Sequence, residues 1–153
     1  MILILGASGY VGKRLMISFQ ENSYDAVGTE FYDLSHEEAT GTYRSTLTEN
    51  LIFFDSNKMD LSELDIDFTK VTHLVVSTAS TQILDEVRKQ WDNDPQAEYK
   101  INITNITRIF DFCFERKIVP VFMSSDGVFD GQDGNYSEED SPNPIHRYGK
   151  IKF

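Results

Sequence analysis

The chain has 153 residues, of which 40% are hydrophobic, so it is long enough for one globular domain with a buried core. Its 25 acidic and 14 basic residues give a formal net charge of −11, which argues against nucleic acid and anionic membranes as partners. A single cysteine, Cys113, excludes an intrachain disulfide, and no apolar run is long enough to span a bilayer. The expected location is the cytoplasm.

Short apolar runs alternate with helical patterns along the chain. Ile2–Leu5 predicts a buried strand rather than a signal peptide, because no basic leader precedes it. A helix is expected over roughly Tyr10–Asn22, and four further strands are expected at Asp25–Phe31, Leu51–Phe54, Thr72–Thr78 and Ile118–Met123. Runs that are apolar on both faces indicate an α/β fold with a doubly wound parallel sheet. A loop or an irregular edge is expected at the polar segment Tyr32–Asn50, and a loop at Gly131–Pro144.

The helix before the fifth strand has the clearest pattern. Asp94 is placed to cap it and Pro95 takes its first position. One apolar side follows at three- and four-residue steps through Tyr99, Ile103, Ile106, Phe110, Cys113 and Phe114. A second apolar side, made of Ile101, Ile109 and Phe112, indicates either a wide core-facing stripe or burial beneath further chain or in a dimer interface.

A glycine-rich turn, Gly6-Ala7-Ser8-Gly9-Tyr10-Val11-Gly12, lies directly between the first strand and its helix. Gly6 is expected to make the tight turn, Gly9 to let backbone N–H groups approach a pyrophosphate, and Gly12 to let the helix pack close to the sheet. The turn therefore predicts a site for NAD or NADP that is formed by Gly6, Ser8, Gly9, Tyr10, Val11 and Gly12. A turn with a structural role alone is the other interpretation.

Glu30 is expected at the tip of the second strand. A carboxylate there would accept hydrogen bonds from the adenosine ribose hydroxyls and repel a 2′-phosphate, which slightly favours NAD over NADP. Lys13 and Arg14 lie near the same end of the site and could instead serve NADP. A solvated surface acid is the alternative interpretation of Glu30.

Two segments near the C-terminus carry the candidate chemistry. Tyr148 and Lys152 are four residues apart, so a helix places them on one face, one turn from each other. Ser125, at the end of the preceding strand, can reach the same point. Such a trio suits proton donation to a carbonyl that receives hydride from a nicotinamide. The three histidines have no metal-ligand spacing, so no metal site is expected: His36, His73 and His146.

In order and spacing, four segments resemble the extended short-chain dehydrogenase/reductases, and most of all their dTDP-4-dehydrorhamnose reductase (sugar-nucleotide 4-ketoreductase) branch. They are Gly6–Gly12, Tyr99–Asn102, Ser124–Gly131 and Tyr136–Lys150. The resemblance implies a Rossmann-like fold in which Ser125 orients the ketone, Tyr148 donates the proton, and Lys152 activates the tyrosine and holds the nicotinamide ribose.

The same resemblance implies further cofactor contacts. Asp60 and Leu61 would lie on the adenine side, and Ala79 and Ser80 on the pyrophosphate side. A turn acid, a core leucine and two small turn residues are the alternative interpretations of these four. Asn102 matches the family's helix asparagine and is expected to be structural.

The chain departs from the family pattern at Gly127, where the family usually has tyrosine, and at Ile151, where it has a small hydroxyl residue. Family members are also considerably longer, and the last strands of their sheet and their substrate domain have no counterpart here. Residues 1–153 are therefore interpreted as an incomplete NAD(P)-binding Rossmann domain, the nucleotide-binding portion of a reductase of 4-keto-6-deoxy nucleotide sugars. This portion is expected to be inactive alone and to form a homo-oligomer that covers the outer edge of Ile118–Met123.

Two alternatives to this reductase stay open. One is a non-catalytic regulatory module that binds a dinucleotide or a sugar nucleotide, and the other is an inactive remnant of the enzyme.

Overall fold

The computed structural model describes residues 1–30, 51–78, 96 and 99–153. They form two compact units. The first, called the sheet unit here, takes its described residues from Met1–Ala79 and Asn105–Phe122, and the second, the C-terminal unit, from Ser80–Thr104 and Met123–Phe153. The predicted loop Tyr32–Asn50 and the predicted helix start at Asp94 and Pro95 lie outside the described residues.

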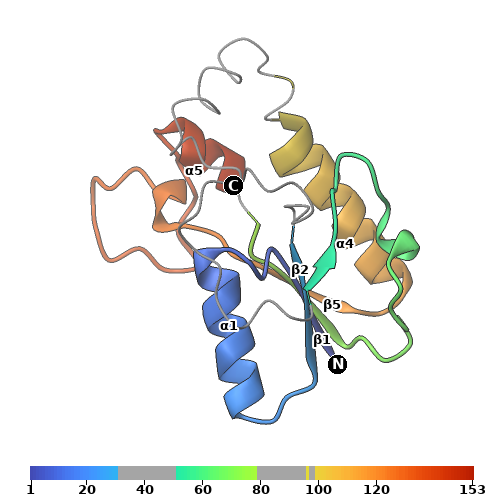
Figure 1. Cartoon of the computed structure of the whole chain (residues 1–153). Coiled ribbons are helices and arrows are strands. Elements are labelled where there is room, and N and C mark those ends of the chain that lie inside the picture. The colour runs from blue at the N-terminus through green and yellow to red at the C-terminus, as the bar shows by residue number, and fades with distance from the viewer. Residues whose placement is uncertain (31–50, 79–95, 97–98) are drawn as a thin grey trace, which may run out of the picture. The chain divides into compact units, whose positions relative to one another are not determined.

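A parallel five-stranded sheet forms the sheet unit (Figure 1). Its strands are β1 (Ile2–Leu5), β2 (Ala26–Glu30), β3 (Leu51–Phe53), β4 (His73–Val76) and β5 (Val119–Phe122). The five predicted strands are thus confirmed within a residue or two. The spatial order is β3-β2-β1-β4-β5, so the chain fills one side of β1 first and then crosses to the other. The carboxyl end of β1 is therefore the topological switch point where such sheets bind ligands.

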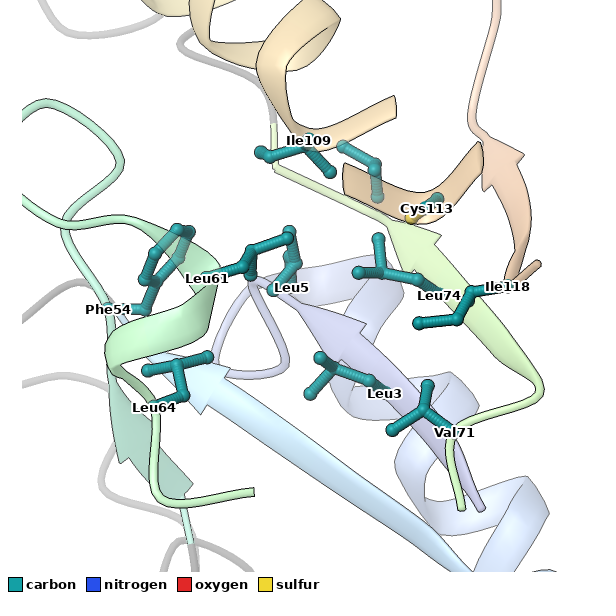
Figure 2. Close-up of a cluster of buried hydrophobic side chains, with 11 residues drawn as sticks. Leu3, Leu5, Phe54, Leu61, Leu64, Val71, Leu74, Ile109, Cys113 and Ile118 are labelled. Atoms are coloured by element: carbon teal, nitrogen blue, oxygen red, sulfur yellow. The ribbon is translucent and has the colours of Figure 1, made fainter. Parts of the chain in front are cut away.

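Helices cover both faces of this sheet, as the alternation of side chains along β1 requires. Ile4 packs with Met16 of helix α1 (Tyr10–Glu21) on one face. Leu3 and Leu5 pack on the other face with Ile109 of helix α4 (Asn105–Glu115), as Figure 2 shows. The short 3-10 helix η1 (Leu61–Glu63) closes that second face. The fold is therefore a Rossmann-like α/β fold with a sheet wound on both sides.

Strand β5 lies at the edge of the sheet, and its side chains are exposed there: Val119 is 51% and Val121 38% exposed. The N–H of Val119 donates to Thr72 O at 2.9 Å, so position 120 faces outward, away from β4. Pro120 has no N–H to present at that position. The expected row of unpaired N–H groups is therefore interrupted, because proline at an edge removes a donor that another strand could use. The predicted homo-oligomer stays a prediction.

The helix before β5 begins with an irregular turn. Residues Lys100–Thr104 form a π-helical turn, η2, directly before α4 begins at Asn105. Ile106, Ile109, Phe110, Phe112 and Cys113 face the core, whereas Tyr99 and Phe114 are 62% and 65% exposed. The wide core-facing stripe is confirmed, and burial at its two ends was predicted wrongly.

In the C-terminal unit, a closed loop joins the 3-10 helix η3 (Asp126–Val128) to helix α5 (Arg147–Lys152). The Asp130 carboxylate accepts hydrogen bonds from the Tyr136 hydroxyl at 2.5 Å and from Asn143 Nδ2 at 2.8 Å. These bonds lower the pKa of Asp130, and the carboxylate raises the pKa of Tyr136. Asn143 N donates to Val128 O at 2.9 Å. Hydrogen bonds thus join the end of the predicted loop Gly131–Pro144, at Asn143, to the residues just before the loop, Val128 and Asp130.

Candidate functional site

Two glycines of the turn after β1 are required by the fold itself. Gly6 has φ +80°, and a Cβ there would lie 2.7 Å from Thr78 Cγ2. A Cβ on Gly12 would lie 2.2 Å from Gly6 O, because α1 packs directly on the turn. The structure therefore supports the tight-turn role of Gly6 and the close-packing role of Gly12.

Gly9 differs from the other two. Its φ is −72°, which any residue can adopt, and within the part of the chain that the structure describes a Cβ would meet only Gly6 O, at 3.3 Å. It is the N-cap of α1, but no side chain among the described residues caps the helix, and no acidic residue stands in its first turn. Ser8, Tyr10 and Val11 are exposed beside it. The N–H groups of the first turn thus face an open, electropositive helix end that fits an anionic group.

The other residues predicted to contact the cofactor differ in how accessible their side chains are. Glu30 is the last residue of β2 and is half-buried, at the strand tip where it was expected. Asp60 has an exposed side chain at the N-cap of η1, whereas Leu61 is 4% exposed in the core. Only the backbone of Leu61 is therefore left for a ligand. Ala79 and Ser80 lie outside the described residues.

Two side chains on α4, Asn105 and Arg108, hold the segment that leads to Asp60, and neither was expected from the sequence. The Arg108 guanidinium forms an ion pair with the Asp60 carboxylate. The amide Nδ2 of buried Asn105 donates to Asn57 Oδ1 at 2.9 Å and to Ser56 Oγ at 3.2 Å. No local sequence signal links positions so far apart in the chain.

In the C-terminal unit, η3 and α5 pack against each other and bring the Ser125 turn to the Tyr148 turn. A Cβ on Gly149 would lie 1.9 Å from Gly127 O, so only glycine allows this approach. Ser124 Oγ also donates to Lys152 O at 3.5 Å. The sequence-predicted trio therefore shares one compact unit.

Within that unit, each member of the trio has a defined setting. Ser125 Oγ accepts from Gly127 N at 3.1 Å and donates to Asp126 Oδ1 at 3.2 Å. Tyr148 is 42% exposed, and Lys152 Nζ lies 5.9 Å from the centroid of its ring. An accessible phenol beside a buried amine can donate a proton to a ligand oxygen at the protein surface.

Burial lowers the pKa of the Lys152 ammonium, and Lys152 is 8% exposed. Since its pKa is then lower in the folded than in the unfolded chain, charged Lys152 opposes folding at neutral pH, and stability rises with pH as the lysine loses its proton. Lys152→Met should therefore raise the thermal midpoint at pH 7, by about 2–4 °C for each kcal/mol relieved. Thermal unfolding across alkaline pH should show this gain shrinking, and Lys150→Met, on the exposed side of α5, should show none. A thermal midpoint of Lys152→Met below that of the wild type at pH 7 would contradict the inference that the charged Lys152 side chain opposes folding.

Among the described residues, no group of three histidine, cysteine or acidic side chains is arranged to hold a metal ion. The helices described are also too short or too polar to cross a membrane.

A switch-point glycine turn together with a tyrosine–lysine helix defines a Rossmann-like protein of the extended short-chain dehydrogenase/reductase class. The model of the RmlD substrate binding domain family matches residues 1–153, and the chain belongs to this family. The resemblance seen in the sequence is thereby confirmed.

Individual relatives are similar over almost the whole chain. The beta subunit of methionine adenosyltransferase 2 from Bos taurus is 31% identical over 99% of this chain and 40% of its own length. A probable low-salt glycan biosynthesis reductase from Haloferax volcanii is 28% identical over 98% of this chain and 45% of its own length. The chain thus spans less than half of these relatives.

Two solved structures share the fold. A hypothetical dTDP-4-dehydrorhamnose reductase from Sulfolobus tokodaii has a TM-score of 0.69 and 27% identity, over 99% of this chain and 48% of that one. MoeE5, solved in complex with UDP-glucose and NAD, has a TM-score of 0.66 and 25% identity, over 99% of this chain and 45% of that one.

Proposed function

We propose that residues 1–153 are the nucleotide-binding portion of an NAD(P)-dependent reductase that acts on 4-keto-6-deoxy nucleotide sugars. The observation that carries the proposal is the close packing of Gly149 on Gly127, which joins the Ser125 turn to the Tyr148–Lys152 turn. Similarity to a hypothetical dTDP-4-dehydrorhamnose reductase and to a probable glycan biosynthesis reductase supports it.

In this proposal the three side chains divide the chemistry at the ketone. The Ser125 hydroxyl donates a hydrogen bond to the ketone oxygen and orients it, and the Tyr148 hydroxyl gives that oxygen a proton. Lys152 lies one helical turn away and supports the tyrosine. The nicotinamide cofactor, when bound, supplies the hydride that the carbon receives.

The cofactor would be held by the turn after β1, with Gly6, Ser8, Gly9, Tyr10, Val11 and Gly12 at the pyrophosphate. The open N-terminus of α1 supports this placement. Glu30 at the tip of β2 supports a preference for NAD, because a carboxylate there repels a 2′-phosphate. The related MoeE5 structure contains NAD. Asp60 and Ala79-Ser80 are proposed as further contacts, with Leu61 acting through its backbone.

The test is reduction of a 4-keto-6-deoxy nucleotide sugar, followed by the loss of reduced-nicotinamide absorbance. Orientation of the sugar supplies much of the rate, and the chain spans less than half of its relatives, so the chain alone should bind cofactor without turnover. In a longer protein that contains these residues, Tyr148→Phe should lower kcat by about 10²–10⁴-fold. A kcat that Tyr148→Phe leaves unchanged would refute the assignment. Turnover by the chain alone that depends on Tyr148 would show that a second copy or a partner completes the site.

A second candidate function is a dinucleotide-binding subunit of another enzyme. Its support is the 31% identity to a protein named as the beta subunit of methionine adenosyltransferase 2. The glycine at position 127, where the reductase family usually has tyrosine, also favours a subunit over a reductase. Sedimentation of the chain mixed with a methionine adenosyltransferase, with and without NAD, separates the two functions. A complex without reductase activity would favour the subunit.

A further inference from the structure

The peptide group between Leu5 and Gly6 is held at both of its polar ends by side-chain hydroxyls. Gly6 N donates to Thr29 Oγ1 at 3.3 Å, and Leu5 O accepts from Ser77 Oγ at 2.7 Å. These two backbone groups belong to one planar peptide unit. Leu5 O also accepts from Ser77 N at 3.1 Å, so the two hydroxyls add to this backbone bond in fixing the orientation of the plane. Thr29 comes from β2 and Ser77 from the segment after β4, on opposite sides of β1.

The orientation of the Leu5–Gly6 peptide is not fixed by the local backbone and depends on hydrogen bonds from other segments. β1 ends at Leu5, and the next residue is a glycine with φ +80°, whose backbone has more freedom than that of any other residue. Thr29 O also accepts from Ala7 N at 2.8 Å, so Thr29 holds two successive N–H groups. Ser77 Oγ lies 3.3 Å from Gly6 O, the carbonyl that accepts from Gly9 N at 3.0 Å. Thr29 and Ser77 therefore also contact backbone groups of Gly6 and Ala7, in the segment that leads into α1.

We propose that Thr29 and Ser77 are positioning residues of the dinucleotide site, an inference that rests on the proposed function. Thr29 is 2% exposed, so it cannot touch a bound cofactor and acts only through the turn. By fixing the Leu5–Gly6 peptide, the two hydroxyls fix the direction of the N–H groups from Ser8 to Gly12. Without them the backbone bond from Ser77 N to Leu5 O remains, but Gly6 N loses its side-chain acceptor. The turn then has more freedom, which the ligand must remove on binding, and binding is weaker.

The decisive variants are Thr29→Val, which keeps the shape of threonine without its hydroxyl, and Thr29→Ser, which keeps the hydroxyl. In calorimetric titration with NAD, Thr29→Val should weaken binding about tenfold and Thr29→Ser should restore most of the affinity. Ser77→Ala should weaken binding similarly. Thr72→Val is the matched control, because Thr72 Oγ1 donates to Met1 O at 3.3 Å, at the opposite end of β1. It should leave the affinity unchanged.

Thermal midpoints and amide NMR spectra separate positioning from general destabilisation. Thr29→Val should shift or broaden the amide signals of Ser8–Gly12, whereas Thr72→Val should not. Wild-type affinity in both Thr29→Val and Ser77→Ala overturns the inference and leaves the proposed function intact. A loss of affinity in Thr72→Val equal to that in Thr29→Val also overturns it. A wild-type chain that binds neither NAD nor NADP refutes the proposed function and, with it, the positioning role.

Discussion

Gly9→Val should weaken NAD binding by at least about a hundredfold, roughly 2.7 kcal/mol, while the chain stays folded. The backbone at Gly9 has φ −72° and ψ 169°, a conformation that valine adopts readily, and the only close neighbour of a Cβ among the residues described is Gly6 O. A Cβ at 3.3 Å requires Gly6 O to move by a few tenths of an ångström, so the cost to the fold is smaller than at Gly12, where the same atom would lie at 2.2 Å. The valine methyl groups would instead stand at the N-terminus of α1, where the proposed function places the pyrophosphate.

Calorimetric titration with NAD and with NADP measures this effect, and thermal unfolding checks the fold. Gly12→Ala is the informative contrast, because its Cβ would lie 2.2 Å from Gly6 O and should lower the thermal midpoint directly. Equal affinity of Gly9→Val and the wild type would remove the dinucleotide site from this turn. A wild type that prefers NADP would instead move the cofactor assignment from Glu30 toward Lys13 and Arg14.

Gly149→Ala should separate the Tyr148 turn from the Ser125 turn. The new methyl group would stand 1.9 Å from Gly127 O, 2.8 Å from Gly127 C and 3.1 Å from Pro144 Cβ, so backbone must move. Overpacking of this kind costs about 1–3 kcal/mol or more. Because α5 has only six residues, it has little helical stability of its own to resist the displacement.

Gly127→Ala is the matched control on the opposite side of the same contact. A Cβ at Gly127 would meet Ser125 Oγ at 3.4 Å and Gly149 Cα at 3.9 Å, which are ordinary van der Waals distances. Hydrogen exchange in Arg147–Lys152 should accelerate in Gly149→Ala and stay near wild type in Gly127→Ala. Similar exchange in all three proteins would show that this contact does not hold α5 in place.

The sequence by itself determined the features that repeat locally along the chain. Apolar runs located β1 to β5 because the strands of a covered parallel sheet are rich in apolar residues. The glycine turn was found because its spacing is set over a few residues, and Tyr148 and Lys152 because one helical turn brings them together.

Only the tertiary structure decided which distant residues meet. Thr29 and Ser77 on the Leu5–Gly6 peptide, and Arg108 on Asp60, are contacts between segments far apart in the chain. The position of a hydroxyl or a charged group in the sequence does not indicate which distant residue it will contact. The exposure of Tyr99 and Phe114, at the two ends of the apolar stripe on the helix before β5, could also not be predicted, because periodicity indicates which face of a helix is buried but not where along the helix the core ends. Periodicity predicts elements, whereas the pairing of polar groups depends on how the sheet brings those elements together.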